Sequence, residues 1–533
     1  MSQVDCLLIG HYALSVNKQV QVAEIAFGKN SLYYYDTLEK TFIMHEGRNL
    51  TSSQLYNQFY SNGHGDMSFD HVTFEHSFNT AVANLGTYLV RNGVSIDLVN
   101  TFNQGRRRLP DMLAHTQFVI AAIPTTFYIS AFPIAQIVRF LRSHGLQGKT
   151  VVGGPFVKNV ASTYAGNAAA LARIFDSIGA DYYVSSSDGE QTLLRLIQAL
   201  KAGTDTSAVP NLYIRHAHGY HFTGARPEQL TYGRSMVDWE LFADHVPEIV
   251  NVRTSKSCPF DCAFCGLPVT GGKWKSVPVE EIESELNALR GQGRQPDVFF
   301  IDETLNFPPR KFSEMLRMII RNNYNFKWEG ELRCNTLDRE TVRLMSESGC
   351  QMVHLGIESG SQRILDNMTK RVQLDEYYRA LDLLNEFEIM TTALILVGFP
   401  GETEETFQET FDFIESRRPT LFRVHRWFYD HETPVHADRE RYDIEGGGYQ
   451  WKHATMDAAR AHELATHLSL DVRNAIHTDD YSMAFYLAHK GHSHAQIRNF
   501  LSAFDKAIKH KCRSVPGTSV PQKYVDELKT ALR

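Results

Sequence analysis

The chain has 533 residues, 43% of them hydrophobic and 22% charged, and its formal net charge is −7. This composition is typical of a globular protein with sizeable cores, and the length suggests about two to four domains. Nothing in this slightly acidic balance indicates the basic surface by which most proteins bind nucleic acids, so we expect no nucleic-acid partner. The first residues lack the features of a signal peptide, and no apolar run approaches about 18 residues, so we expect a cytoplasmic protein with no membrane partner.

The first 215 residues are expected to be built around one sheet. Val4–Ile9 is typical of a strand, and we assign residues 1–70 to an N-terminal elaboration of the sheet that follows. Over residues 71–215 apolar strands alternate with amphipathic helices, which indicates a doubly wound, Rossmann-like parallel sheet. The expected helices are 78–92, 134–144, 171–177 and 191–202, and the expected strands are 94–100, 118–123, 150–152 and 182–184.

Small and hydroxylated residues gather where these strands end: Thr125, Thr126, Gly153, Gly154, Ser186 and Gly189. Ligands of doubly wound sheets bind at the carboxyl ends of the strands. Small residues there would let a large flat ligand lie close to the backbone. The alternative is that these residues only form tight turns, which need glycine for their local geometry. The pattern alone does not choose between the two.

A second α/β run follows a connector at residues 216–247. Its expected strands are 249–254, 297–301, 328–333, 352–357, 392–397 and 421–427, and 279–291 is expected to be a helix. Six strands, each followed by a helix or a turn, predict a partial (β/α)6 barrel over residues 248–440, with its catalytic face at the carboxyl ends. Residues 441–533 are rich in His and Ala and are expected to form a helical C-terminal domain.

Three of the 7 cysteines, Cys258, Cys262 and Cys265, have the spacing C-x3-C-x2-C in SCPFDCAFCG. Three thiolates on one short loop can hold three irons of a [4Fe–4S] cluster and leave the fourth iron open to an outside ligand. A zinc site usually needs a second C-x2-C pair or nearby histidines, and a buried trio of inert thiols is the remaining alternative. The scattered Cys6, Cys334, Cys350 and Cys512 are expected to be apolar filler in a reducing cytoplasm.

The segments CPFDCAFC, GIESG and GFPGET together resemble the radical S-adenosylmethionine (SAM) superfamily over roughly residues 248–440. The preceding domain, with TT, GGP and SSDGE after successive strands, resembles the cobalamin-binding domain that often precedes that barrel. Together they resemble the cobalamin-dependent (class B) radical SAM enzymes, a group dominated by methyltransferases. The segments DCLLIGH and GGPFVKN are similar to the branch that contains the P-methyltransferase of phosphinothricin tripeptide biosynthesis.

The resemblance implies roles by position. The three cysteines would ligate the cluster. SAM would be contacted by Phe264, Asp302, Glu303, Arg333, Glu358 and Gly398. In the simpler alternatives, Asp302 is a helix N-cap, Glu358 pairs with Arg333, and GFPGET is only a turn with Glu402 in the first turn of the next helix.

Cobalamin would rest on the six small residues at the strand ends of the first domain. The motif D-x-H-x-x-G, which supplies a histidine to cobalt in some cobalamin proteins, does not occur in the chain. The resemblance therefore predicts a cobalamin with no histidine on its cobalt. His425, His431, His436 and His453 are expected to be core or solvated residues, and a role in binding the substrate is the alternative.

The expected activity is transfer of a methyl group to an unactivated carbon or phosphorus centre of a small-molecule or peptide intermediate in natural-product biosynthesis. An electron donor such as flavodoxin or ferredoxin would reduce the cluster. Two alternatives stay open at this point. One is a ring contraction, cyclisation or rearrangement with the same cofactors, and the other is a regulatory module with a degenerate barrel.

Overall fold

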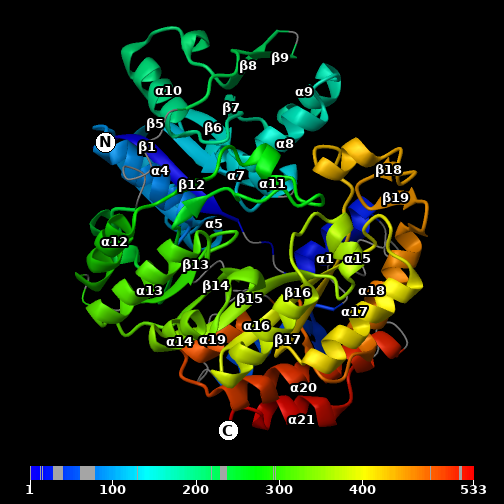
Figure 1. The fold of residues 1–533 in the computed structure, drawn as a ribbon. Coiled ribbons are helices and arrows are strands. Elements are labelled where there is room, and N and C mark those ends of the chain that lie inside the picture. The colour runs from blue at the N-terminus through cyan, green and yellow to red at the C-terminus, as the bar shows by residue number, and fades with distance from the viewer. Residues whose placement is uncertain are drawn as a thin grey trace. The chain divides into compact units, whose positions relative to one another are not determined.

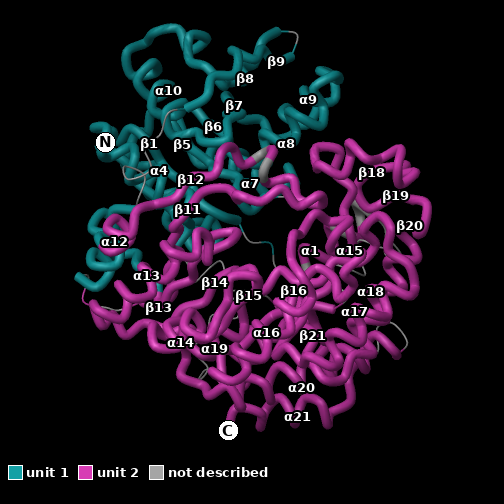
Figure 2. The backbone as a smooth tube through the Cα atoms, in the orientation of Figure 1, with its two compact units in different colours: residues 1–14, 74–247, 284–292 teal, residues 15–73, 248–283, 293–533 magenta. Residues whose placement is uncertain are grey.

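The computed structural model describes residues 2–12, 14, 16–27, 40–60, 78–128, 130–217, 219–228, 237–291, 293, 296–480, 482–514 and 519–533. The chain divides into two compact units. The first comprises residues 1–14, 74–247 and 284–292, and the second comprises 15–73, 248–283 and 293–533 (Figure 2). Each unit contains one large sheet.

The sheet of the first unit has seven strands in the order β4-β1-β5-β6-β7-β8-β9 (Figure 1). The first five strands in this order pair in parallel, and β7, β8 and β9 pair antiparallel. The strands are β1 (Ser2–His11), β4 (Ile96–Thr101), β5 (Thr116–Pro124), β6 (Lys149–Gly153), β7 (Tyr182–Val184), β8 (Leu212–His216) and β9 (Gly219–Phe222). Numbered by their order in the chain, the parallel strands therefore run 2-1-3-4-5. The expected doubly wound sheet is confirmed. The region expected to be a connector, residues 216–247, supplies β9, the last strand of the antiparallel hairpin.

Helices follow most of the parallel strands, as the periodicity predicted. They are α4 (Thr80–Arg91), α5 (Phe102–Gly105), α6 (Leu109–His115), α7 (Ala131–Ser143), α8 (Pro155–Thr163), α9 (Ala168–Ile178) and α10 (Glu190–Ala202). Asn79 caps α4, because its side-chain oxygen accepts hydrogen bonds from the amides of Ala81 and Val82. The strand β1, which lies between β4 and β5, is fully buried from Cys6 to Ile9. This burial on both faces is why its sequence is apolar without alternation.

The sheet of the second unit also has seven strands, in the order β10-β13-β14-β15-β16-β17-β21, and all of them pair in parallel. They are β10 (Ile249–Val252), β13 (Asp297–Phe300), β14 (Trp328–Leu332), β15 (Cys350–Glu358), β16 (Met390–Val397), β17 (Leu421–Arg426) and β21 (Ile476–His477). Each strand lies beside the previous one in the chain, as in a barrel that has not closed. The six predicted strands are present, and β21 adds a seventh from the C-terminal region.

The helices between these strands are α11 (Leu267–Thr270), α12 (Val279–Gly291), α13 (Pro309–Asn322), α14 (Arg339–Glu347), α15 (Gln362–Asn367), α16 (Leu374–Glu386) and α17 (Glu404–Arg417). The C-terminal region contains α18 (Ala458–Asp471), α19 (Met483–His489), α20 (His494–Arg513) and α21 (Gln522–Thr530). It also holds a small antiparallel sheet of β18 (Glu445–Gly447), β19 (Gln450–His453) and β20 (Met456–Asp457). The helical C-terminal region expected from the sequence is thus confirmed, and a small antiparallel sheet accompanies the helices.

The N-terminal segment after β1 belongs to the second unit, which differs from the elaboration of the first sheet that we expected. It contains α1 (Val16–Phe27), β2 (Ile43–His45), β3 (Arg48–Leu50) and α3 (Ser52–Tyr60). Leu55 and Tyr56 of α3 share one buried core with Phe500 of α20 and Leu528 of α21. The hydroxyl of Ser52 donates to the carboxylate of Asp480 at 2.6 Å. Apolar burial against the last helices thus decides where this segment packs.

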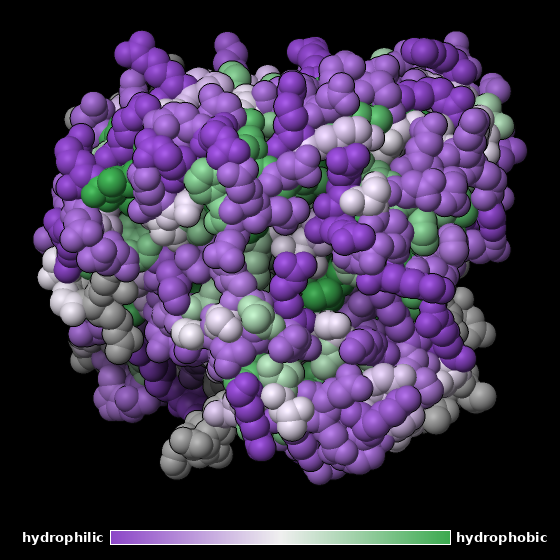
Figure 3. Space-filling model, turned by 60° about the horizontal axis from the view of Figure 1, so that its bottom comes forward, coloured by the Kyte–Doolittle hydropathy of each residue, from purple (hydrophilic) through white to green (hydrophobic). Residues whose placement is uncertain are grey.

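The part of the surface visible in Figure 3 is mostly hydrophilic, with apolar residues scattered over it. The large hydrophobic residues exposed among the described residues are Phe132, Leu241, Val269, Phe428 and Tyr449. No helix in the described parts of the chain has both the length and the apolar character needed to cross a membrane.

Candidate active site

The cysteine loop follows the first strand of the second sheet. It begins after β11 (Ser255–Lys256) and returns through α11 to β12 (Lys275–Ser276), which pairs antiparallel with β11. Cys262 is buried, and Cys258 and Cys265 are half-buried. The loop is fixed by backbone bonds, because the Ala263 amide donates to the Met368 carbonyl at 2.8 Å and the Ala263 carbonyl accepts from the Val435 amide at 3.0 Å. The three thiols are thus held on one anchored loop at the carboxyl end of β10.

The protein around the thiols disfavours a bare thiolate. Burial raises the pKa of the Cys265 thiol to about 11 and also raises the pKa of Cys258. Thiols in such surroundings ionise when a metal takes the place of the proton. Within the described residues, no three or more His, Cys, Asp or Glu side chains are arranged around a single metal ion. In an iron–sulfur cluster each thiolate binds its own iron, so the sulfurs need not converge on one atom.

Arg333 supports the cysteine loop from β14. Its guanidinium lies 4.0 Å from the ring centre of Phe260, donates to the Cys262 Sγ at 3.5 Å, and also donates to the Lys370 carbonyl. Asn306 fixes the Arg333 backbone by accepting from its amide at 3.1 Å and donating to its carbonyl at 2.7 Å. The structure therefore places Arg333, which was predicted to contact SAM, beside the cysteines. Its side chain contacts Phe260 and Cys262 of the cysteine loop and the Lys370 carbonyl.

Asp302 and Glu303 lie together after β13 but in different surroundings. Asp302 is buried, and its carboxylate accepts from the Thr254 amide at 2.9 Å and from the hydroxyls of Thr254 and Ser255. It ties β13 to the start of the cysteine loop rather than capping a helix. Glu303 stays exposed. The protein around it nevertheless lowers its solvation and raises its pKa to about 7, an effect to which the nearby Glu331 carboxylate adds.

Glu358 ends β15 at a bulge in its pairing with β16 and takes a left-handed φ of 66°. A non-glycine residue adopts this conformation only where the surroundings enforce it. Its carboxylate accepts from the Lys370 ammonium at 2.8 Å, and both side chains are largely buried. A Cβ on Gly356 would lie 2.9 Å from each of these charged atoms, so glycine makes room for the pair. The partner is Lys370 and not Arg333, which corrects the alternative drawn from the sequence.

Lys370 is the residue that the sequence analysis missed at this site. Its ammonium lies 5.6 Å from the ring centre of Phe264, the aromatic residue between Cys262 and Cys265. Phe264 also packs edge-on against Phe399 of the GFPGET turn, with ring centres 6.5 Å apart. No motif marks Lys370, because it comes from a loop after α15. Only the fold brings the GIESG glutamate, the cysteine loop and this lysine together.

The GFPGET turn is held from both sides. The Gly398 amide donates to Glu402, and its carbonyl accepts from the His453 Nε2 at 3.1 Å. A Cβ on Gly398 would lie 2.7 Å from Trp451 and Ala461. Both backbone polar groups of Gly398 are therefore used inside the chain. Glu402 precedes α17 and is buried, which raises its pKa to about 8, so it is not in the first helical turn as the alternative had it.

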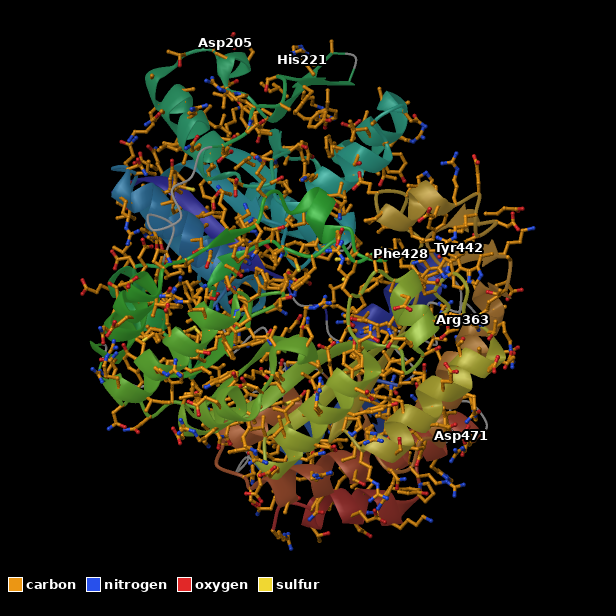
Figure 4. All side chains as sticks on the ribbon, viewed as in Figure 1. Asp205, His221, Arg363, Phe428, Tyr442 and Asp471 are labelled. Atoms are coloured by element: carbon orange, nitrogen blue, oxygen red, sulfur yellow. The ribbon has the colours of Figure 1, made fainter. Side chains whose placement is uncertain are left out.

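The four histidines noted in the sequence lie around this end of the sheet. His453 is buried and bonds to Gly398, and burial lowers the pKa of His425 to about 4. His431 and His436 stack with ring centres 4.9 Å apart in the loop that bonds to Ala263. Phe428, which is labelled in Figure 4, begins that loop and packs edge-on against Tyr449 at 5.0 Å.

The strand-end residues of the first unit fall into two groups. Thr125 is fully buried, and its hydroxyl donates to the Gly153 carbonyl at 2.9 Å and accepts from the Phe156 amide at 3.2 Å. Gly154 has a φ of 113°, and a Cβ there would lie 3.0 Å from the Thr125 hydroxyl. Thr125, Gly153 and Gly154 thus form an internally bonded turn. This is the tight-turn alternative left open by the sequence.

Thr126, Ser186 and Gly189 remain at least partly exposed. Gly189 differs from Gly154 because a Cβ there would meet nothing closer than Val184 at 3.8 Å, and its φ of 166° is extended. The local structure therefore has room for a side chain where the sequence has none. This open space at the end of β7 is what a bulky ligand lying against the backbone requires.

Residues 252–414 match the family model of the radical SAM superfamily. This segment is a radical SAM domain. It begins with the last residue of β10, includes the cysteine loop and ends within α17. The resemblance read from CPFDCAFC, GIESG and GFPGET is thereby confirmed for this part of the chain.

Relatives resemble the chain beyond the radical SAM domain. An uncharacterized methyltransferase, PH0819, of Pyrococcus horikoshii is 28% identical over 239 residues, which are 43% of this chain and 52% of that protein. The chain thus spans about half of that relative. The structure of the radical SAM methyltransferase TsrM from Kitasatospora setae, determined with cobalamin and a [4Fe–4S] cluster, superposes with a TM-score of 0.53 at 18% identity. It covers 67% of this chain and 70% of TsrM.

A second solved structure is OxsB, a cobalamin-dependent SAM radical enzyme determined with aqua-cobalamin and SAM. It superposes with a TM-score of 0.51 at 15% identity and covers 68% of this chain and 56% of OxsB. At these identities the likeness establishes the fold. It also extends well past the 252–414 segment of the family model.

Proposed function

We propose that the chain is a cobalamin-dependent radical SAM methyltransferase, acting on an unactivated carbon or phosphorus centre of a small-molecule or peptide natural-product intermediate. One observation carries the proposal. A radical SAM domain and a 2-1-3-4-5 parallel sheet with an open, glycine-bearing strand end occur in one chain. The likeness to the folds of TsrM and OxsB, and to a curated methyltransferase, supports it.

The cofactors supply the bond-breaking chemistry: when bound, the cluster and SAM generate a carbon radical, and methylcobalamin carries the methyl group. The chain positions them. Cys258, Cys262 and Cys265 would hold the cluster. Arg333 donates a hydrogen bond toward the Cys262 sulfur. A hydrogen bond from a cation to a ligating sulfur stabilises the more negative, reduced state of a cluster.

Lys370, Glu358 and Glu303 would bind SAM through opposite charges. SAM carries an ammonium, a carboxylate and a sulfonium, and charge-assisted hydrogen bonds to such groups are the strong ones. The Lys370–Glu358 pair presents both signs beside Phe264. Glu303 is exposed at the neighbouring strand end and is the carboxylate available to an ammonium. Asp302, whose oxygens bind Thr254 and Ser255, would instead hold the cysteine loop in place.

Gly398 would contribute through shape rather than through hydrogen bonds, since Glu402 and His453 take its amide and carbonyl. In the first unit, cobalamin would lie over the exposed strand ends at Thr126, Ser186 and Gly189. The bonded turn of Thr125, Gly153 and Gly154 would form the floor beneath. An external one-electron donor such as flavodoxin or ferredoxin would reduce the cluster.

Methyl transfer is distinguished from a rearrangement by the mass of the product. The reconstituted protein would be incubated with SAM carrying a deuterated methyl group and with an extract of the producing cell. A product that gains one labelled methyl group supports the proposal, and a matched reaction with Cys262→Ala controls for adventitious labelling. Substrate consumption with an unlabelled, rearranged product would instead favour the ring-contraction or cyclisation alternative.

A further inference from the structure

The inner face of the second sheet is closed by apolar residues at the amino ends of its strands. In a barrel-like sheet the helices cover one face and the other lines the interior. Trp328 of β14 packs against α13, so the next residue, Glu329, lies on the inner face. Glu329 pairs with Met352, and Met352 pairs with Met390. Met352, Met390 and Leu421 share one buried core with α3, α19 and α20, so these helices close the interior from that end.

The next residues of the inner face toward the carboxyl ends are polar. His354 of β15 pairs with Thr392 of β16, and both are buried. The His354 Nε2 lies 3.1 Å from a carboxylate oxygen of Glu329. The Thr392 hydroxyl has no hydrogen-bond partner among the described residues. The apolar packing therefore ends after one row of side chains, and a polar floor lies above it. Such a floor favours a polar ligand over an apolar one.

His425 lies on the same face, nearer to the carboxyl edge. It alternates with Leu421 and Arg423 along β17, and it pairs with Leu396 of β16. Its side chain is exposed to solvent. It forms no hydrogen bond with any other residue that the structure describes. His425 thus presents an accessible imidazole on the inner face, above the polar floor and at the end of the sheet that the helices leave open.

The surroundings of His425 keep its ring uncharged. Although the ring is accessible, the protein around it replaces much of its solvation, and this desolvation lowers the pKa to about 4. The charge of Arg423 lowers the pKa further, whereas the Asp479 carboxylate after β21 acts in the opposite direction. A neutral imidazole offers one hydrogen-bond donor and one acceptor, without a charge. It therefore suits an uncharged polar group of a ligand.

We propose that His425 binds the methyl-accepting substrate through a hydrogen bond to an uncharged polar group, such as a hydroxyl or an amide. The inference rests on the proposed function and deepens it, because it assigns a substrate contact and a substrate class. The polar floor and the accessible imidazole select a polar substrate. Glu358 ends the strand β15 at the same edge of this sheet, where SAM would bind, so a substrate on His425 would reach the edge at which the radical forms.

The first measurement asks which ligand covers His425. The full chain, loaded anaerobically with its cluster, would be treated with diethyl pyrocarbonate, which acylates neutral imidazoles, and peptide mass spectrometry would locate the modified residues. His425 should react equally fast at about pH 5.5 and about pH 7.5, whereas an ordinary imidazole should slow about tenfold at the lower pH. The substrate, purified by following the deuterated methyl label into its product, should protect His425. SAM alone should not.

The second measurement separates substrate binding from a structural role. His425→Phe keeps a planar ring and removes the hydrogen bond. Cluster content and SAM affinity should be unchanged, and the KM for the purified substrate should rise about three- to tenfold while kcat changes little. More 5′-deoxyadenosine should form for each labelled product. His425→Gln, which retains a donor and an acceptor, should recover most of the affinity. His467→Phe is the matched control, because His467 is exposed on α18 and bonds to Asp471.

The other outcomes overturn the proposal in distinguishable ways. An unchanged KM in His425→Phe would remove the substrate contact, and protection of His425 by SAM alone would assign the contact to SAM. A KM that rises by more than about 100-fold and is not recovered by His425→Gln would indicate a charged contact and refute the substrate class. A wild-type chain that cleaves SAM but never forms a methylated product would refute the proposed function, and the role of His425 would fail with it.

Discussion

The carboxyl ends of the two parallel sheets carry opposite kinds of residue. In the second sheet they carry charges, and most of these are already engaged: Asp302 with Thr254, Arg333 with the cysteine loop, and Glu358 with Lys370. In the first sheet the strand-end residues expected to contact cobalamin are small and uncharged, and one of them, Gly189, leaves space unfilled. Strand ends that carry charged residues suit a small polar ligand, which ion pairs can hold. Strand ends that carry small residues suit a wide ligand, which can lie close to the backbone.

The largest expected effect is loss of the cluster. Replacing Cys258, Cys262 and Cys265 by Ala should abolish the cluster absorption and the formation of 5′-deoxyadenosine, because no other ligand remains on the loop. Iron analysis and product chromatography measure both. Cys512→Ser is the matched control, since Cys512 lies on α20 and should leave both properties intact. A triple variant that still holds about four irons would show that these three cysteines do not ligate the cluster.

The next test addresses the first sheet with two glycines. Gly189→Val should fold normally and lose cobalamin, because its side chain fills space that the protein leaves open. Gly154→Val should lose about 1–3 kcal/mol of folding free energy whether or not cobalamin binds there, since its φ of 113° is strained for valine. Thermal unfolding and cobalamin absorbance separate the two effects. Undiminished cobalamin binding by Gly189→Val would show that the open space is not the binding surface.

A third test asks what the Glu358–Lys370 pair does in the second sheet. Glu358→Ala leaves the buried Lys370 ammonium without its carboxylate and should cost about 3–5 kcal/mol of folding free energy. Adding Lys370→Met should recover much of that loss, as measured by urea unfolding. If Glu358 also binds SAM, the double variant should still bind SAM about 1.5–3 kcal/mol more weakly by calorimetry. Restored stability together with unchanged SAM affinity would make the pair purely structural.

The last test concerns the pH dependence of the GFPGET turn. The folded pKa of Glu402 is about 8, above its ordinary value of 4.5, so the folded chain favours the neutral acid. The free energy of unfolding should therefore fall, by on the order of 5 kcal/mol, as the pH rises from about 4.5 to about 8, and stay level beyond. Glu402→Gln, which keeps an acceptor for the Gly398 amide, should flatten this profile. An equally steep profile in Glu402→Gln would assign the dependence to another group.

Local sequence determined several features that the structure confirms. Helix and strand periodicity located every parallel strand of both sheets except β21, because an apolar strand buried on both faces reads as a continuous run. Spacing within one loop placed Cys258, Cys262 and Cys265 together, and the short sequence between them cannot separate them. The segments CPFDCAFC, GIESG and GFPGET, taken together, located the radical SAM domain that the family model matches at residues 252–414.

Only the tertiary structure decided which distant residues meet. Lys370 reaches Glu358 from another loop, β21 joins the second sheet from the C-terminal region, and α3 packs against the last helices. The first strand in the chain, β1, lies between β4 and β5, which both come later in the sequence. Gly154 and Gly189 look alike in the sequence and differ only in backbone angle and surrounding space. These features depend on long-range packing, which sets strand order, side-chain neighbours and strain, and no local pattern encodes them.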